Sequence, residues 1–197
     1  MSADDRTRWD AKYRERGPTS GEPDPFLLEA ARLPPGLPTA GRALDVAGGA
    51  GRHALWLARR GLDVTVCDVS PVGLDLAAAA AAEAGLELST RLLDLEEQPL
   101  PTPPPSTAGG WDLILCFHFL HRPLFAAIPA ALSPGGLFLF CQPTRKNLER
   151  HPHPSARFLL EQGELARLVP PGLEVVHLEE GWSERGRHEA RLIARGT

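Results

Sequence analysis

The sequence predicts a doubly wound α/β fold in which a seven-stranded, mostly parallel sheet ends in an antiparallel hairpin. Two observations support this fold class. Between residues 42 and 141, short apolar or β-branched segments alternate with helical segments of about ten residues, which is typical of parallel βαβ units. The last two predicted strands are separated by residues 181–187, a connection too short for a crossover helix, so we expect them to pair antiparallel.

The first half of this pattern carries clear local signals. Residues 42–46 predict a strand, and residues 51–60 predict a helix that a glycine ends. Residues 63–67 are rich in β-branched side chains and predict the second strand. An alanine-rich helix over residues 71–84 follows, with Ser70 as its N-cap and a proline at its first position.

The second half continues the alternation. The segment at residues 111–117 is almost wholly apolar, which predicts a strand that is buried on both faces. A Pro-Gly-Gly turn precedes the fifth strand. In order, the remaining predicted elements are strands 86–93 and 111–117, helix 123–132, strand 136–141, helix 163–168, and strands 173–179 and 188–194.

Length and composition favour one folded domain. The chain has 197 residues, of which 43% are hydrophobic, so it can bury a substantial core. Proline-rich stretches at residues 34–38 and 99–105 fit neither a helix interior nor a central strand, and we interpret both as loops. We expect a single domain over residues 1–197, with N-terminal cap helices in residues 1–40 and the α/β core in residues 41–197.

Charge and targeting signals narrow the function classes. The net charge of -4 argues against non-specific binding of nucleic acid over a broad surface. The first residues are too polar for a signal peptide and no run of 18 apolar residues follows, so we expect a cytoplasmic protein outside the membrane. Cys67, Cys116 and Cys141 each lie within an apolar run, which predicts reduced core thiols and no metal cluster.

A glycine-rich segment between the first strand and helix carries the strongest functional signal. The glycines of residues 48–51 let the backbone turn tightly, and the following helix N-terminus offers free N–H groups. Residues 49–54 also satisfy the dinucleotide pattern G-x-G-x-x-A. Asp45 favours a different ligand, because a carboxylate inside the strand needs a partner, which the ammonium of a methionine moiety would supply.

Two more acidic residues follow the next two predicted strands. Asp68 can accept hydrogen bonds from both ribose hydroxyls of an adenosyl ligand, or it can cap the next helix. Asp94 can recognise an adenine ring together with the backbone N–H and side chain of Leu95, or it can belong to a simple turn. Together with Asp45, they lie at the ends of three successive strands, where open α/β sheets bind ligands.

In order and spacing, residues 45–51, Asp68 and Asp94 resemble the first three motifs of class I S-adenosylmethionine-dependent methyltransferases, which have a Rossmann-like fold. The segments 9–13, 25–28, 143–148 and 187–191 resemble small bacterial methyltransferases labelled tellurite-resistance-like. The resemblance implies S-adenosylmethionine as cofactor. The residues expected to hold it are Asp45, Ala47, Gly48, Gly49, Gly51, Asp68, Val69, Asp94, Leu95, Cys116 and Tyr13.

The methyl acceptor is expected beside the end of the fourth strand. His118 and His121 follow this strand and are candidates for a base or an acceptor contact. The segment contains no Asn/Asp-Pro-Pro-aromatic string and no Pro-Cys pair, which argues against methylation of adenine and cytosine. The nearby groups are mainly apolar and neutral, so we expect a small acceptor such as a thiol, a phenol or a selenium or tellurium species, with little need for a base.

Alternative functions stay open at this point, among them the methylation of RNA or protein. The G-x-G-x-x-A pattern and Asp68 also allow an NAD-type oxidoreductase, and a non-catalytic, cofactor-binding regulatory subunit is a further possibility. Trp9 and Tyr13 are four residues apart and share a helix face. This N-terminal helix either packs on the core through its aromatic face or closes as a lid over the cofactor.

Overall fold

The computed structural model describes residues 3–19, 22–103 and 109–197. Its seven strands form one sheet in the order β3-β2-β1-β4-β5-β7-β6, which confirms the predicted fold class. The strands are β1 (Arg42–Val46), β2 (Asp63–Asp68), β3 (Ser89–Leu92), β4 (Trp111–Phe117), β5 (Leu132–Pro143), β6 (Leu173–Trp182) and β7 (His188–Gly196). β1 to β5 pair in parallel, whereas β7 pairs antiparallel with both β5 and β6.

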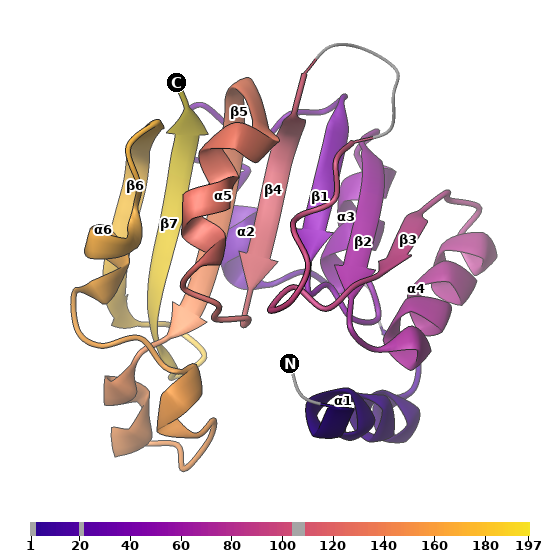
Figure 1. Ribbon diagram of the computed structural model, residues 1–197, viewed down its shortest axis with the longest axis horizontal. Coiled ribbons are helices and arrows are strands. Elements are labelled where there is room, and N and C mark those ends of the chain that lie inside the picture. The colour runs from indigo at the N-terminus through magenta and orange to yellow at the C-terminus, as the bar shows by residue number, and fades with distance from the viewer. Residues whose placement is uncertain (1–2, 20–21, 104–108) are drawn as a thin grey trace.

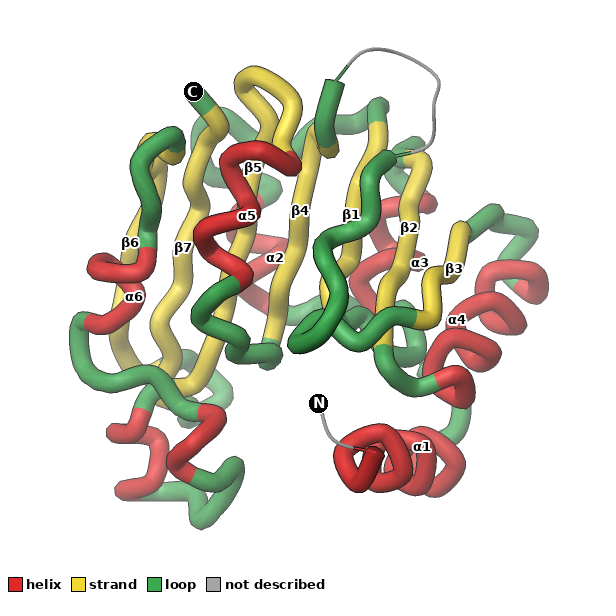
Figure 2. Tube along the Cα trace, viewed as in Figure 1, coloured by secondary structure: helices red, strands yellow, loops and turns green. Residues whose placement is uncertain are grey.

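Helices cover both faces of this sheet. In Figure 1, α5 and α6 lie in front of it and α2 and α3 lie behind it, while α1 lies beyond the ends of the central strands. The tube in Figure 2 shows the same layers. The helices are α1 (Ala3–Arg16), α2 (Pro25–Ala30), α3 (Arg52–Arg59), α4 (Pro71–Glu83), α5 (Leu124–Ala131) and α6 (Glu164–Leu168), with short 3-10 helices η1 (Arg145–Glu149) and η2 (Ala156–Phe158).

The topology places a ligand site between β1 and β4. From β1 the chain proceeds through β2 to β3 on one side of the sheet, and from β4 to β5 on the other. In open α/β sheets, the carboxyl ends of the strands at such a switch point form a crevice that binds ligands. The helix α1 lies at this end of the sheet (Figure 1).

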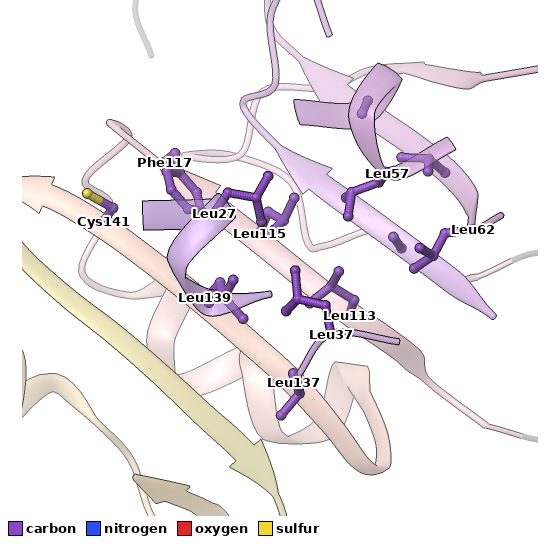
Figure 3. Packing of buried hydrophobic residues seen from close by; sticks show 14 of the residues in the cluster. Leu27, Leu37, Leu57, Leu62, Leu113, Leu115, Phe117, Leu137, Leu139 and Cys141 are labelled. Atoms are coloured by element: carbon purple, nitrogen blue, oxygen red, sulfur yellow. The ribbon is translucent and has the colours of Figure 1, made fainter. Parts of the chain in front are cut away.

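The core consists of two hydrophobic clusters, because successive side chains of a strand point to opposite faces. The even-numbered residues Ile114 and Cys116 belong to the cluster that includes α5. Figure 3 shows the other cluster, in which Leu27 of α2 packs with odd-numbered residues of β4 and β5. These strand residues are Leu113, Leu115, Phe117, Leu137, Leu139 and Cys141.

Several predicted strand limits were wrong, and the largest errors concern the third and fifth strands. The third strand covers Ser89–Leu92 and not residues 86–93, because the Leu86 N–H donates to the Ala81 carbonyl and still belongs to the end of α4. The fifth strand covers Leu132–Pro143 and not residues 136–141. It begins before the Pro-Gly-Gly turn, whose residues bulge out of the register between β4 and β5.

Two smaller predictions are confirmed, the N-cap of α4 at Ser70 and the buried free thiols. Ser70 caps α4 through an Oγ that accepts a hydrogen bond from the Gly73 N–H at 3.1 Å. Cys67, Cys116 and Cys141 are buried free thiols. In the part of the chain that the structure describes, no helix has both the length and the apolar character to cross a membrane.

Candidate cofactor and acceptor site

A cleft of about 950 Å³ opens at the carboxyl ends of the central strands, which is large enough for a nucleoside-sized ligand. Its floor includes Asp45, Ala47, Gly48 and Asp68. One wall is the segment at residues 117–120 after β4. The opposite boundary and the mouth are formed by α1 and by the segment at residues 151–155, together with polar side chains such as Gln142, Asn147 and Arg187.

Two glycines of the β1–α3 loop are required by close packing. A Cβ at Gly48 would lie 2.7 Å from the carboxylate of Asp45 and 2.8 Å from Val66. Gly51 has a φ of +78°, and a Cβ there would lie 2.8 Å from the Cβ of Ala77 in α4. Real Cβ contacts are longer than this, so any side chain at either position would force the loop away from the strand or from α4.

Asp45 is a buried carboxylate with an unused oxygen. Its side chain is 1% exposed, and Oδ2 has no hydrogen-bond partner among the described residues. Burial raises the pKa of Asp45 to about 7, although Arg52 acts in the opposite direction. His53 Nδ1 is 3.9 Å from Oδ1, but burial lowers the pKa of His53 to about 3, so the ring is neutral and does not balance the charge. A cationic donor at the cleft floor would therefore find an unpaired acceptor.

Asp68 connects the glycine loop to the start of α4. Its Oδ2 accepts from the Gly49 N–H at 2.9 Å, and its Oδ1 accepts from the Ser70 N–H at 2.8 Å. Burial raises the pKa of Asp68, whereas these backbone donors lower it. An ionised carboxylate has about four acceptor positions, so these backbone bonds do not use all of the acceptor capacity of Asp68.

Asp94 and Leu95 lie off the cleft. Asp94 Oδ1 accepts from the Glu96 N–H at 3.0 Å, and the Asp94 N–H donates to Gln98 Oε1 at 3.0 Å, so this aspartate organises a turn. Glu96 lines the cleft instead. Of the candidate residues, the structure brings together on the lining Tyr13, Asp45, Ala47, Gly48, Asp68 and His118. The candidates that do not line it are Gly49, Gly51, Val69, Asp94, Leu95, Cys116 and His121.

The helix α1 rests on the glycine loop. The rings of Trp9 and Tyr13 stack, with centroids 5.8 Å apart. A Cβ at Gly49 would lie 2.0 Å from the Tyr13 hydroxyl, so the phenol sits directly on the loop. Asp10 accepts a hydrogen bond from the Ser70 hydroxyl at the start of α4. These contacts put α1 across the cleft and not on either hydrophobic cluster.

The wall that follows β4, where the sequence led us to expect the acceptor, contains a carboxylate–histidine pair that sequence reasoning missed. His118 Nε2 is 3.4 Å from Oδ2 of Asp24, the N-cap residue of α2. Arg52 Nη2 is 3.6 Å from the same oxygen. Burial alone would raise the pKa of Asp24, but the hydrogen bond and charge of His118 and the nearby Arg52 hold it well below its usual value. The sequence signal was an aspartate before a proline, which predicts a helix start but not its tertiary partner.

Gln142 is a second polar group that sequence reasoning did not place among the site residues. It is 2% exposed, lines the cleft from the end of β5, and donates from Nε2 to the Phe158 carbonyl at 2.5 Å. Its Oε1 has no partner in the described part of the chain. The cleft thus offers two orphaned oxygens, one on each side of the switch point.

Comparison with known proteins gives the family. The model of a family described as a methyltransferase domain matches residues 43–136. A ubiquinone biosynthesis O-methyltransferase of Xanthomonas axonopodis pv. citri is 29% identical over 170 residues, which is 83% of this chain and 65% of the relative. The chain therefore spans a little under two thirds of the length of this curated relative.

Solved structures show the same fold. TehB from Haemophilus influenzae superposes with a TM-score of 0.71 over 96% of this chain and 67% of that chain, at 19% identity. The N-methyltransferase NodS from Bradyrhizobium japonicum, in complex with S-adenosyl-L-homocysteine, superposes with a TM-score of 0.64 over 87% of this chain and 84% of that chain, at 19% identity.

Proposed function

Because the chain belongs to the class I S-adenosylmethionine-dependent methyltransferase family, with S-adenosylmethionine as its cofactor, we propose that it methylates a small-molecule acceptor. The observation that carries this proposal is the unpaired Oδ2 of Asp45 on the cleft floor, beside a glycine loop that close packing keeps free of side chains. When bound, the cofactor supplies a methyl group on a positively charged sulfur that a nucleophile can displace in line.

The residues of the β1–β2 side have the groups that this cofactor requires. Asp45 would bind the ammonium of the methionine moiety, and the backbone of Ala47 and Gly48 would lie along it. The free acceptor positions of Asp68 would take the ribose hydroxyls. The other candidate residues do not line the cleft. They would contribute through backbone groups, by supporting the lining residues from behind, or after a local movement of their segment. These residues are Gly49, Gly51, Val69, Asp94, Leu95 and Cys116.

Asp45 also argues against the dinucleotide alternative. NAD carries no ammonium group, so it would leave this buried carboxylate oxygen without a partner. Asp68 is compatible with either ligand, since both contain a ribose. The proposed assignment therefore depends on Asp45 and not on the glycine pattern.

Two acceptor classes have support from the cleft. Apolar side chains of the wall, Phe117, Phe119 and Leu120, suit a soft acceptor such as a thiol or a selenium or tellurium species. The pair formed by Asp24 and His118 favours instead an acceptor with a hydroxyl group, because such an acceptor, unlike a thiol, needs a base near neutral pH.

The test uses methyl-labelled S-adenosylmethionine and cell extract fractionated into small molecules, RNA and protein. We expect label in the small-molecule fraction with the wild-type chain and strongly reduced label with Asp45→Asn. Label confined to RNA or protein would contradict the proposal. Cofactor binding without label in any fraction would favour the non-catalytic regulatory subunit.

A further inference from the structure

We propose that Asp24 positions His118 as the general base of the acceptor site and that the methyl acceptor therefore carries a hydroxyl group, of the phenol or enol type. This inference rests on the proposed methyl transfer and names its substrate class. His118 would be the catalytic residue, since it lines the cleft, and Asp24 would be a positioning residue that acts through it.

The carboxylate of Asp24 is held rigidly by the start of α2. Its Oδ1 accepts from the Phe26 N–H at 3.1 Å, which is an N-cap interaction. Oδ2 is left to face His118 Nε2 at 3.4 Å, and the residue as a whole is only 5% exposed. Because one oxygen of Asp24 caps the helix and the other faces the ring, the carboxylate keeps the imidazole in one orientation.

The backbone of His118 is unusual in a way that fits this role. Its φ is +60°, in the left-handed region that residues other than glycine seldom adopt. The conformation is maintained by its N–H, which donates to the Cys141 carbonyl at 2.8 Å. Such conformations concentrate at functional sites, where the fold holds a side chain in an otherwise unfavourable direction.

The other charged or titratable groups around His118 do not compete for this role. The groups that face it are Asp24, Arg52, His53, Cys141 and Glu189. Burial keeps His53 neutral by lowering its pKa and keeps the Cys141 thiol protonated by raising its pKa. Glu189 lies 3.6 Å from the guanidinium of Arg191. Asp24 is the carboxylate within hydrogen-bond range of the ring, and its low pKa keeps it ionised.

An ionised carboxylate beside an imidazole fixes the ring and stabilises the imidazolium that forms when the ring takes up a proton. In the proposed step, the acceptor hydroxyl gives its proton to a ring nitrogen of His118, and its oxygen lone pair forms the new bond to the methyl carbon. The electron pair of the broken carbon–sulfur bond stays on the departing thioether. A thiol ionises near neutral pH and gains little from this arrangement, whereas a phenol with a pKa of about 10 gains much.

The first test compares two hydroxyl probes with one variant. Asp24→Asn keeps a side-chain oxygen that can cap α2 but removes the charge. With catechol as probe, whose hydroxyls are protonated at pH 7.5, we expect kcat to fall about 10- to 1,000-fold. With 4-nitrophenol, which is largely ionised at this pH, we expect kcat to fall by less than about threefold. A merely structural role for Asp24 would lower both rates equally and would overturn the proposal.

A second measurement needs neither cofactor nor acceptor. We expect the ring NMR signals of His118 in the cofactor-free protein at fixed pH to change position in Asp24→Asn, because the ring loses its neighbouring charge. His121→Ala, which removes a histidine off the cleft, is the matched control and should leave the His118 signals unchanged. Unmoved His118 signals in Asp24→Asn overturn the pair.

The outcomes separate the two proposals. Methylation of thiophenol but of neither hydroxyl probe would overturn the hydroxyl assignment while leaving methyl transfer intact. If the labelled extract and all three probes stay unmethylated, the proposed function fails, and the His118 NMR signals still decide whether Asp24 contacts His118.

Discussion

The two sides of the cleft are built in different ways. On the cofactor side, Asp45, Gly48 and Asp68 come from two neighbouring strands and the loop between them, so a short stretch of sequence contains the whole arrangement. On the acceptor side, Asp24 and His118 are 94 positions apart and meet only because α2 packs behind β4. A site formed by one βαβ unit can be predicted from the spacing of residues in the sequence. A site formed by tertiary contacts can be recognised only in the folded structure.

The orphaned oxygen of Asp45 gives the largest expected effect. Asp45→Asn keeps the shape but removes the charge, and losing one partner of a buried charged pair costs about 2–5 kcal/mol. We expect affinity for S-adenosylmethionine to fall about 30-fold or more, as measured by calorimetry. A change below about threefold would mean that the cofactor side is not organised around this carboxylate.

The same substitution, Asp45→Asn, should weaken cofactor binding but increase the stability of the cofactor-free protein. Burial raises the pKa of Asp45 to about 7, so the protonated form is favoured in the folded protein. The stability this residue contributes is therefore present below about pH 4 and is lost as pH rises through about 7. In the cofactor-free protein, Asp45→Asn should raise the free energy of unfolding by up to about 4 kcal/mol at pH 8 and by much less at pH 4.5. Urea titrations at both values measure this, and an equal effect at the two would contradict it.

Asp68 should contribute less than Asp45 because water can reach part of its environment in the open cleft. Losing a hydrogen bond to a charged acceptor costs about 1.5–3 kcal/mol, so Asp68→Ala should weaken S-adenosylmethionine and S-adenosylhomocysteine alike by about 10- to 100-fold. Asp94→Ala is the comparison, since its carboxylate belongs to a turn off the cleft. A larger loss of cofactor affinity in Asp94→Ala than in Asp68→Ala would contradict the greater importance of Asp68.

The smallest effect is expected at α1, which contacts the glycine loop through Tyr13 and the start of α4 through Asp10. If α1 is a lid, protease cleavage near Gly17 should slow by about threefold or more when S-adenosylhomocysteine is bound. The measurement is a time course of limited proteolysis with and without ligand. Equal cleavage in both states would contradict the lid.

The success of sequence reasoning followed the same division between the two sides. The fold class and the antiparallel C-terminal hairpin were predicted because hydrophobic periodicity, the length of a connection and the N-cap at Ser70 are local features. The limits of β3 and β5 were missed because hydrogen bonds at the end of α4 and a bulge against β4 decide them. Asp24 was missed because an N-cap looks the same whether or not its second oxygen faces a histidine.

The most direct test of the cofactor assignment is thermal unfolding with S-adenosylhomocysteine or NAD at about one hundred times a typical dissociation constant. A ligand at this excess stabilises the folded state by about 2.7 kcal/mol, which for a domain of this size corresponds to about 5–10 °C. We predict this rise in Tm for S-adenosylhomocysteine, a much smaller rise in Asp45→Asn, and none with NAD. A rise with NAD and none with S-adenosylhomocysteine would contradict the assignment.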